Sequence, residues 1–285
     1  MTTMDGINAM EKRDDARQRD NEQPPVCVVK DARGVLTLTL NRPVVRNAFN
    51  RAMVEQLQAH LLAAAQDSTI RLVVLDANGP HFCAGGDIAW MRAILGESES
   101  RMREAAQAIS GMLQAADALP QPLVAVVRGA AMGGGFGLAC CADIVLADES
   151  TRLGLGEVRL GIIPSLISPY LVRAIGRRQA SQLALTAQSL TADEAAAIGV
   201  VSQVCAGAEL DAQVARMVTT LLKGAPGAQR RSKRLLRDMR LDEDCAQSAN
   251  ASIEHIVAAW QQPEAAEGMQ AFLDKRAPAW GASSM

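Results

Sequence analysis

The chain has 285 residues, of which 49% are hydrophobic and 21% charged, and its formal net charge is −2 at pH 7. This composition is that of an ordinary globular protein, and the small net charge argues against a nucleic-acid-binding protein that relies on a basic surface. The longest apolar stretches are broken by Gly, Arg or Asp before they reach the ~18–20 residues of a membrane-spanning helix.

Residues 1–24 are polar and carry mixed charges. They lack the apolar centre of a secretory signal peptide, and their acidic residues argue against a mitochondrial presequence. We therefore expect a disordered tail and a cytoplasmic location. The six cysteines show no C-x-x-C spacing, so reduced thiols are expected and a zinc site is not.

Short strand-like runs alternate with helical patterns after the tail. The strand-like runs cover residues 26–30, 35–40, 71–77, 123–129 and 143–148. Between the second and third of them, residues 50–67 show a helical pattern that Asn50 can cap. This alternation predicts an α/β fold with a largely parallel sheet built from βαβ units.

The strand-like runs end near residue 200, and a set of helical patterns takes their place. These patterns cover 208–223, 228–240, 242–261 and 263–275. Just before them, Thr191 and Glu194 fit a capping box that begins a further helix, which Gly199 would end. We therefore predict an α/β core over residues 25–205 and a helical module over residues 206–285.

Two glycine-bearing turns stand out, HFCAGGDI at 81–88 and GAAMGGGFG at 129–137. Each follows an apolar strand-like run and leads into a helix-like segment, so its first backbone N–H groups have no helical acceptor. Two such N–H groups that converge form an oxyanion hole, which stabilises negative charge on a carbonyl oxygen.

Glu157 lies in the segment LGLGEVRLGIIP, about 20 residues after the second turn. Most glutamates are surface residues, but the sequence neighbours of this one are mainly apolar or Gly. An apolar environment raises the pKa of a carboxyl group toward a value suited to proton transfer. An oxyanion hole beside such a carboxylate predicts an enzyme that acts next to a thioester carbonyl.

Four segments resemble the crotonase (enoyl-CoA hydratase/isomerase) superfamily, in the order in which that family carries them. They are LNRPVVRNAFN at 40–50, FCAGGDI at 82–88, GGGFGLACCADI at 133–144 and FLDKRAPAW at 272–280. The resemblance covers nearly the whole chain. It implies a core spiral of ββα units followed by C-terminal helices that mediate trimer contacts, so a homotrimer or a dimer of trimers is expected.

The resemblance also implies roles for single residues. Gly86 and Gly134 would supply the two oxyanion N–H groups, and Glu157 would transfer protons. From the residues themselves, Trp90 and Met91 are expected to line the acyl or pantetheine tunnel, with plain packing as the alternative. The coenzyme A thioester would be contacted by Arg46, Ala48, Ala84, Gly86, Asp87, Ile88, Ala89, Gly133, Gly134, and by Phe272 and Lys275 of a neighbouring subunit. Coenzyme A is part of the substrate, so no separate cofactor and no metal is expected.

Gly137 departs from the family pattern, because hydratases with two glutamates carry the first one at this position. Two subgroups with one glutamate remain open, Δ3,Δ2-enoyl-CoA isomerases and hydratases similar to those of 3-methylglutaconyl-CoA or isohexenylglutaconyl-CoA. The segment at 157–176 resembles the second subgroup, so the first hypothesis is a lyase that hydrates a branched, acidic enoyl-CoA. A third hypothesis, which does not involve catalysis, is an acyl-CoA-binding protein.

Other interpretations of these motifs have less support. A dinucleotide site needs G-x-G-x-x-G, and Leu138 stands where the last glycine would be. His81 has no serine in a G-x-S-x-G turn to activate. Arg46, Arg92 and Arg159 are candidate partners for the CoA phosphates or an acidic acyl group, although exposed arginines are common.

Overall fold

The computed structural model describes residues 23–238, 253 and 256–281. The expected tail over 1–24 therefore lies outside the described residues except for its last two. The same holds for much of the helix expected at 242–261 and for the end of that expected at 228–240. Within the described part of the chain, no helix is long and apolar enough to cross a membrane.

A six-stranded sheet forms the centre of the fold, in the order β1-β2-β3-β4-β6-β9. Its strands are β1 (Val26–Lys30), β2 (Val35–Leu40), β3 (Leu72–Ala77), β4 (Leu123–Val127), β6 (Ile144–Asp148) and β9 (Gln203–Cys205). Strands β1 and β2 pair antiparallel, and all other neighbours in this sheet pair parallel. The five strand-like runs and the largely parallel sheet are thus confirmed. Strand β9, which pairs with β6 at the sheet edge, was not among the expected runs.

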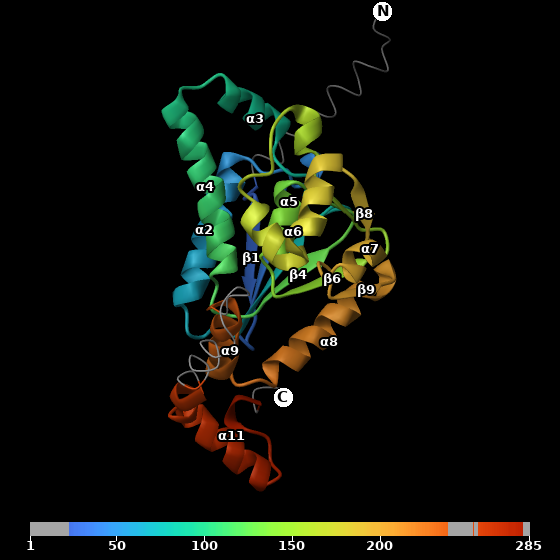
Figure 1. The fold of residues 1–285 in the computed structure, drawn as a ribbon. Coiled ribbons are helices and arrows are strands. Elements are labelled where there is room, and N and C mark those ends of the chain that lie inside the picture. The colour runs from blue at the N-terminus through green and yellow to red at the C-terminus, as the bar shows by residue number, and fades with distance from the viewer. Residues whose placement is uncertain (1–22, 239–252, 254–255, 282–285) are drawn as a thin grey trace, which may run out of the picture.

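Both faces of this sheet are buried, which explains why its strands read as continuous apolar runs. On one face, the side chains of Leu38 and Leu75 join the main core with helices that include α2 and α4. On the other face, Val74 and Val126 pack with Leu210 of α8. Figure 1 shows α2 and α4 side by side and α8 on the opposite side of the strands.

The helices begin and end where local capping chemistry allows. Asn50 Oδ1 accepts the N–H of Met53 at 2.9 Å, and Thr191 and Glu194 form the predicted capping box. Gly199 follows α7 with a φ of +87°. The α-helices of the described residues include α2 (Arg51–Gln66), α3 (Ile88–Leu95), α4 (Glu99–Asp117), α5 (Gly134–Cys140), α6 (Ser168–Thr186), α7 (Ala192–Ala197), α8 (Leu210–Leu222), α9 (Pro226–Asp238) and α11 (Pro263–Leu273).

A second, three-stranded sheet lies beside the first and was not predicted. It consists of β5 (Ala130–Met132), β7 (Arg152–Gly154) and β8 (Ser189–Thr191), in the order β5-β7-β8. Each strand has three residues, which is too short for an alternating pattern to emerge from the sequence. This sheet carries the second glycine turn, because β5 ends directly before Gly133.

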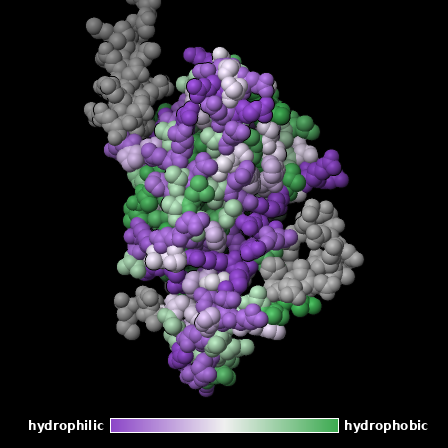
Figure 2. Space-filling view, turned by 90° about the vertical axis from the view of Figure 1, so that its left-hand side faces the viewer, coloured by the Kyte–Doolittle hydropathy of each residue, from purple (hydrophilic) through white to green (hydrophobic). Residues whose placement is uncertain are grey.

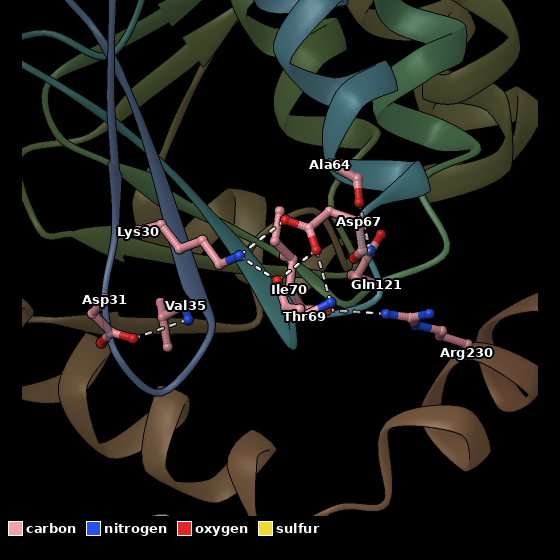
Figure 3. A network of polar contacts seen from close by, with 9 residues as sticks. All are labelled: Lys30, Asp31, Val35, Ala64, Asp67, Thr69, Ile70, Gln121 and Arg230. Atoms are coloured by element: carbon pink, nitrogen blue, oxygen red, sulfur yellow. Dashed lines mark hydrogen bonds and ion pairs between the residues drawn. The ribbon is translucent and has the colours of Figure 1, made fainter.

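A polar network fixes the end of the large sheet that meets α9 (Figure 3). Lys30 Nζ lies 2.9 Å from Asp67 Oδ2, and hydrogen bonds from Thr69 and Lys30 lower the pKa of Asp67 to about 2. Gln121 donates to the carbonyl of Ala64 at 2.7 Å, and Arg230 of α9 donates to the carbonyl of Ile70 at 3.0 Å. The first C-terminal helices are therefore tied to the core.

Candidate active site

The two glycine turns are joined by a short ladder of backbone hydrogen bonds. Cys83 donates its N–H to the carbonyl of Ala130 at 3.0 Å, and Met132 donates to the carbonyl of Cys83 at 2.9 Å. His81 completes the ladder, because its Nδ1 accepts the N–H of Ala130 at 3.2 Å. Turns that are about 50 residues apart in sequence therefore lie side by side.

Phe49 holds the first turn from its other side. Its N–H donates to the carbonyl of Gly85 at 2.7 Å, and its carbonyl accepts the N–H of Asp87 at 2.9 Å. Gly86 lies between these two bonds, and within the described residues its own N–H has no protein acceptor. The peptide that was expected to supply the first oxyanion N–H is thus clamped with that N–H left available.

Gly134 is the first residue of α5, so its N–H has no acceptor within the helix. The neighbouring N–H of Gly133 is not available, because it donates to the carbonyl of Gly154 at 2.9 Å. Gly133 has a φ of +49°, and a Cβ built on it would lie 2.8 Å from Glu157 Oε1. Glycine is needed at 133 both for this backbone conformation and for the close approach of the carboxylate.

Gly86, Gly134 and Glu157 all line one pocket of about 170 Å³, which we call the Glu157 pocket. Its other lining residues are Phe49, Trp90, Met91, Ile94, Ile109, Ile162, Ile163, Pro164, Ser165, Leu166 and Ile167. Trp90 and Met91 line this pocket, and their expected contact with the acyl or pantetheine group stays a prediction. Among the described residues that line it, Glu157 is the one titratable side chain.

Burial raises the pKa of the Glu157 carboxyl group, against the opposing effect of hydrogen bonds from nearby backbone N–H groups. Its Oε2 is buried without a hydrogen-bond partner. We expected the apolar sequence neighbours of Glu157 to bury its carboxyl group. This is only partly right, because Val158 and Leu160 are 37% and 61% exposed. Glu157 begins a short 3-10 helix, and its apolar surroundings come from the following segment 162–167 and from residues distant in sequence such as Phe49, Trp90 and Ile109.

Gly137 lies directly beside Ile167, which lines the Glu157 pocket. A Cβ built on Gly137 would lie 2.5 Å from Ile167 Cβ and closer still to its Cγ2. Ile167 is 3% exposed and precedes α6. The space that a glutamate at position 137 would enter is therefore filled by an apolar side chain.

A second pocket of about 450 Å³, which we call the Arg46 pocket, adjoins the first at Gly86. It is lined by Arg42, Val44, Val45, Arg46, Ala48, Ala84, Gly86, Asp87, Ile88 and Ala89. Seven residues expected to contact coenzyme A are among them. Arg92 and Arg159 line neither pocket.

Phe272 and Lys275 are not brought to these pockets within one chain. Phe272 is at the end of α11, which Figure 1 shows at the end of the molecule opposite α3. Lys275 follows α11 with a φ of +53° rather than continuing the helix. Their expected contact with a neighbouring subunit stays a prediction.

Three residues that organise the site were missed in the sequence. Arg42 is buried and contacts Asp87. Asn47 is fully buried, and its side chain accepts the N–H of Arg42 and donates to the carbonyls of Asn78 and His81 at 2.7, 2.9 and 2.8 Å. Ile167 is the third. Polar residues in the otherwise apolar segment 40–50 were the available signal for the first two, and no local signal marks Ile167.

The described residues contain no group of three or more His, Cys, Asp or Glu side chains placed to hold a metal ion. Five cysteines are free thiols, and Cys245 lies outside the described residues. Burial raises the pKa of Cys83 and of Cys140 to about 12. These thiols are therefore poor nucleophiles.

In this mixed α/β fold, one buried carboxylate and two backbone N–H groups that the described residues leave without an acceptor line the same pocket. The model of the enoyl-CoA hydratase/isomerase family matches residues 30–283, and the chain belongs to this family. The resemblance to the crotonase superfamily and its mixed α/β fold with C-terminal helices is confirmed.

Individual relatives span both activities of the family. The 2,3-dehydroadipyl-CoA hydratase of Escherichia coli (strain K12) is 34% identical over 261 residues, which cover 88% of this chain and 96% of the relative. The trans-2-decenoyl-[acyl-carrier-protein] isomerase of Streptococcus mutans is 33% identical over 205 residues, which cover 71% and 78%. The crystal structure of an enoyl-CoA hydratase/isomerase from Marinobacter aquaeolei superposes with a TM-score of 0.85 at 35% identity, covering 90% of this chain and 99% of that one.

Proposed function

We propose that this protein is an enoyl-CoA hydratase, a lyase that adds water across the 2,3-double bond of an acyl-CoA thioester. The observation that carries the proposal is that one buried carboxylate, with its pKa raised, shares a pocket with two available backbone N–H groups. No separate cofactor enters the reaction, because coenzyme A arrives as part of the substrate.

The proposed reaction begins with the thioester carbonyl between the N–H groups of Gly86 and Gly134. Glu157 removes a proton from water while the water oxygen bonds to C3, and the electron pair of the double bond moves toward the carbonyl oxygen. The two N–H groups stabilise the resulting enolate, and each such donor lowers the barrier by roughly 3–4 kcal/mol. Glu157 then returns the proton to C2, which restores the carbonyl and completes the addition of water.

A single glutamate must serve as both base and acid in this scheme. Ile167 fills the space beside Gly137, and no other titratable side chain of the described residues lines the pocket. A carboxyl group with a raised pKa suits both steps, since it binds and releases a proton nearer to neutral pH.

The proposed acyl group is short and branched or acidic. The Glu157 pocket is small at about 170 Å³, and the segment 157–176 resembles hydratases of branched, acidic acyl groups such as 3-methylglutaconyl-CoA. A relative that is 34% identical carries the name of a hydratase whose substrate is also acidic. The coenzyme A portion would occupy the Arg46 pocket.

A Δ3,Δ2-enoyl-CoA isomerase is the second candidate. It needs only one base to move a proton between two carbons, and one relative of similar identity is named as an isomerase. In this reaction Glu157 would take a proton from C2 of a 3-enoyl-CoA and return it to C4, with the same two N–H groups stabilising the enolate.

We also propose a homotrimer, or a hexamer made from two trimers, in which Phe272 and Lys275 reach the Arg46 pocket of a neighbouring subunit. The exposed apolar side chains of α11 support this, because Phe272 is 81% exposed and Met269 and Leu273 are also exposed. Figure 2 shows apolar surface on the part of the molecule that contains α11. Such surface is typical of an interface.

The test is incubation of the full chain with crotonyl-CoA, 2,3-dehydroadipyl-CoA, 3-methylglutaconyl-CoA and a 3-enoyl-CoA. The absorbance of the conjugated thioester and the mass of the product are followed together. Loss of absorbance with a gain of one water supports the hydratase. A gain of absorbance at unchanged mass supports the isomerase, and binding of these esters without turnover would overturn both in favour of a non-catalytic acyl-CoA-binding protein.

A further inference from the structure

Arg42 and Asp87 form a buried ion pair at the edge of the site. The Arg42 side chain is 9% exposed and that of Asp87 is 17% exposed. Nη1 and Nη2 of Arg42 lie 3.2 and 3.1 Å from Asp87 Oδ2. Nη1 also donates to the carbonyl of Ala48 at 2.6 Å. One guanidinium group therefore ties the segment before Phe49 to the turn that contains Gly86.

The second carboxylate oxygen of Asp87 caps a helix. Oδ1 accepts the N–H groups of Ala89 and Trp90 at 3.0 and 3.3 Å, and so caps the N-terminus of α3. Both oxygens of Asp87 are thus engaged by the protein. Although Asp87 lines the Arg46 pocket, these contacts assign its carboxylate to holding the turn rather than to binding coenzyme A directly.

Gly86 lies inside the frame that these contacts complete. The bonds from Phe49 to Gly85 and from Asp87 to Phe49 fix the peptides on either side of Gly86. Arg42 holds both partners of this clamp, Ala48 on one side and Asp87 on the other. Without Arg42, the 48–49 segment and the 85–87 turn keep their backbone hydrogen bonds but lose the side-chain bridge between them, so the direction of the Gly86 N–H is held less firmly.

We infer that Arg42, through Asp87 and Ala48, is a positioning residue that aims the Gly86 N–H at the thioester oxygen. The inference rests on the proposed function, because it needs a thioester carbonyl at Gly86. A planar guanidinium reaches a carboxylate and a carbonyl at the same time, whereas a lysine presents a single point charge. Arg42→Lys should therefore restore the site only in part.

Loss of stability alone does not test this role, because removing one partner of any buried ion pair is destabilising. The readout must report the oxyanion contact itself. We propose infrared difference spectroscopy of crotonyl-CoA, labelled with carbon-13 at the thioester carbonyl and bound at saturation to the Glu157→Gln protein. Donation of hydrogen bonds to this carbonyl lowers its stretching frequency.

In the Glu157→Gln background, Arg42→Met should lose the part of the frequency shift that the Gly86 N–H contributes, and Arg42→Lys and Asp87→Asn should each lose a smaller part. With Glu157 intact, kcat should fall about 10- to 100-fold for Arg42→Met, the range expected for a misplaced catalytic group. The matched control is Lys233→Met. Lys233 Nζ pairs with Asp143 Oδ2 at 2.6 Å, its side chain is 12% exposed, and it lines neither site pocket.

The outcomes of these measurements separate the positioning role of Arg42 from the proposed function. A shift reduced with Arg42→Met and kept with Lys233→Met supports the positioning role. A shift that Arg42→Met and Asp87→Asn both retain overturns it and leaves the proposed function intact. A Glu157→Gln protein that binds crotonyl-CoA with no carbonyl shift overturns the proposed function and the inference together. If Arg42→Met does not fold, Arg42→Lys and Asp87→Asn decide.

Discussion

Ile167 and Gly137 form a complementary pair, in which the isoleucine side chain occupies the space that any side chain at position 137 would need. Even the first carbon of that side chain would lie 2.5 Å from Ile167 Cβ. The missing carboxylate is therefore not an empty place in the site, because an apolar contact has replaced it.

Gly137→Ala should destabilise the protein by about 1–3 kcal/mol, the usual effect of inserting a methyl group into a packed core. Gly137→Glu should destabilise the protein more than Gly137→Ala does, and it should not improve hydration of crotonyl-CoA. Thermal unfolding and kcat measure both effects. The control is Gly96→Ala, where the added Cβ would meet only Ala93 O at 3.6 Å. Equal stability of the two alanine variants would contradict the packing argument.

Glu157→Gln should lower kcat by about 10²- to 10⁴-fold, the contribution of a general acid or base. Affinity for coenzyme A esters should change little, because glutamine keeps the size of the side chain. Steady-state kinetics and calorimetric titration with crotonyl-CoA measure the two quantities. Turnover within about tenfold of the parent would remove Glu157 from the mechanism.

The pH dependence of kcat/KM should show its acid limb above the ordinary range of a glutamate, which is about 4.3. Burial raises the pKa of Glu157, and hydration begins with the ionised carboxylate. Activity therefore falls as the pH falls through this raised pKa. An acid limb at or below the ordinary glutamate value would show that the titrating group is another residue.

Glu157 should also weaken the fold at neutral pH. The pKa of this acid is raised in the folded state, so its contribution to stability is greatest below the unfolded pKa and is lost as the pH rises through the folded pKa. Glu157→Gln should therefore raise Tm at pH 7 by ~2 °C, and this gain should vanish in acid. Scanning calorimetry across pH tests this, with the exposed Glu149→Gln as control. A gain that does not depend on pH would refute the explanation.

Deletion of residues 265–285 should lower both the mass of the oligomer and the affinity for coenzyme A esters. Phe272→Ala is the sharper variant, because it removes one exposed side chain of α11 and leaves the chain intact. Leu185→Ala, at a similarly exposed position of α6, is its control. Light scattering and calorimetric titration give the two readouts. A truncated monomer that binds these esters normally would end the idea of a shared site.

Local patterns in the sequence predicted the parts of this fold that depend on local chemistry. Five of the six strands of the large sheet and the caps at Asn50 and Thr191 are of this kind. The glycine turns and Glu157 stood out in their local sequence, whereas the assignment of Gly86 and Gly134 as the donors came from the resemblance to a known family. The Arg42–Asp87 pair joins residues 45 positions apart, and the wall around Glu157 combines the segment 162–167 with residues from 49 to 134, so no periodic pattern reveals either arrangement.

The two pockets that meet at Gly86 draw on separate parts of the chain. The Arg46 pocket is built from residues 42–48 and 84–89, whereas one wall of the Glu157 pocket comes from the single segment 162–167. In the proposed function, coenzyme A and the acyl group would thus be recognised by different stretches of sequence. Replacing the segment 162–167 should therefore change the preferred acyl group and leave the binding of coenzyme A unchanged.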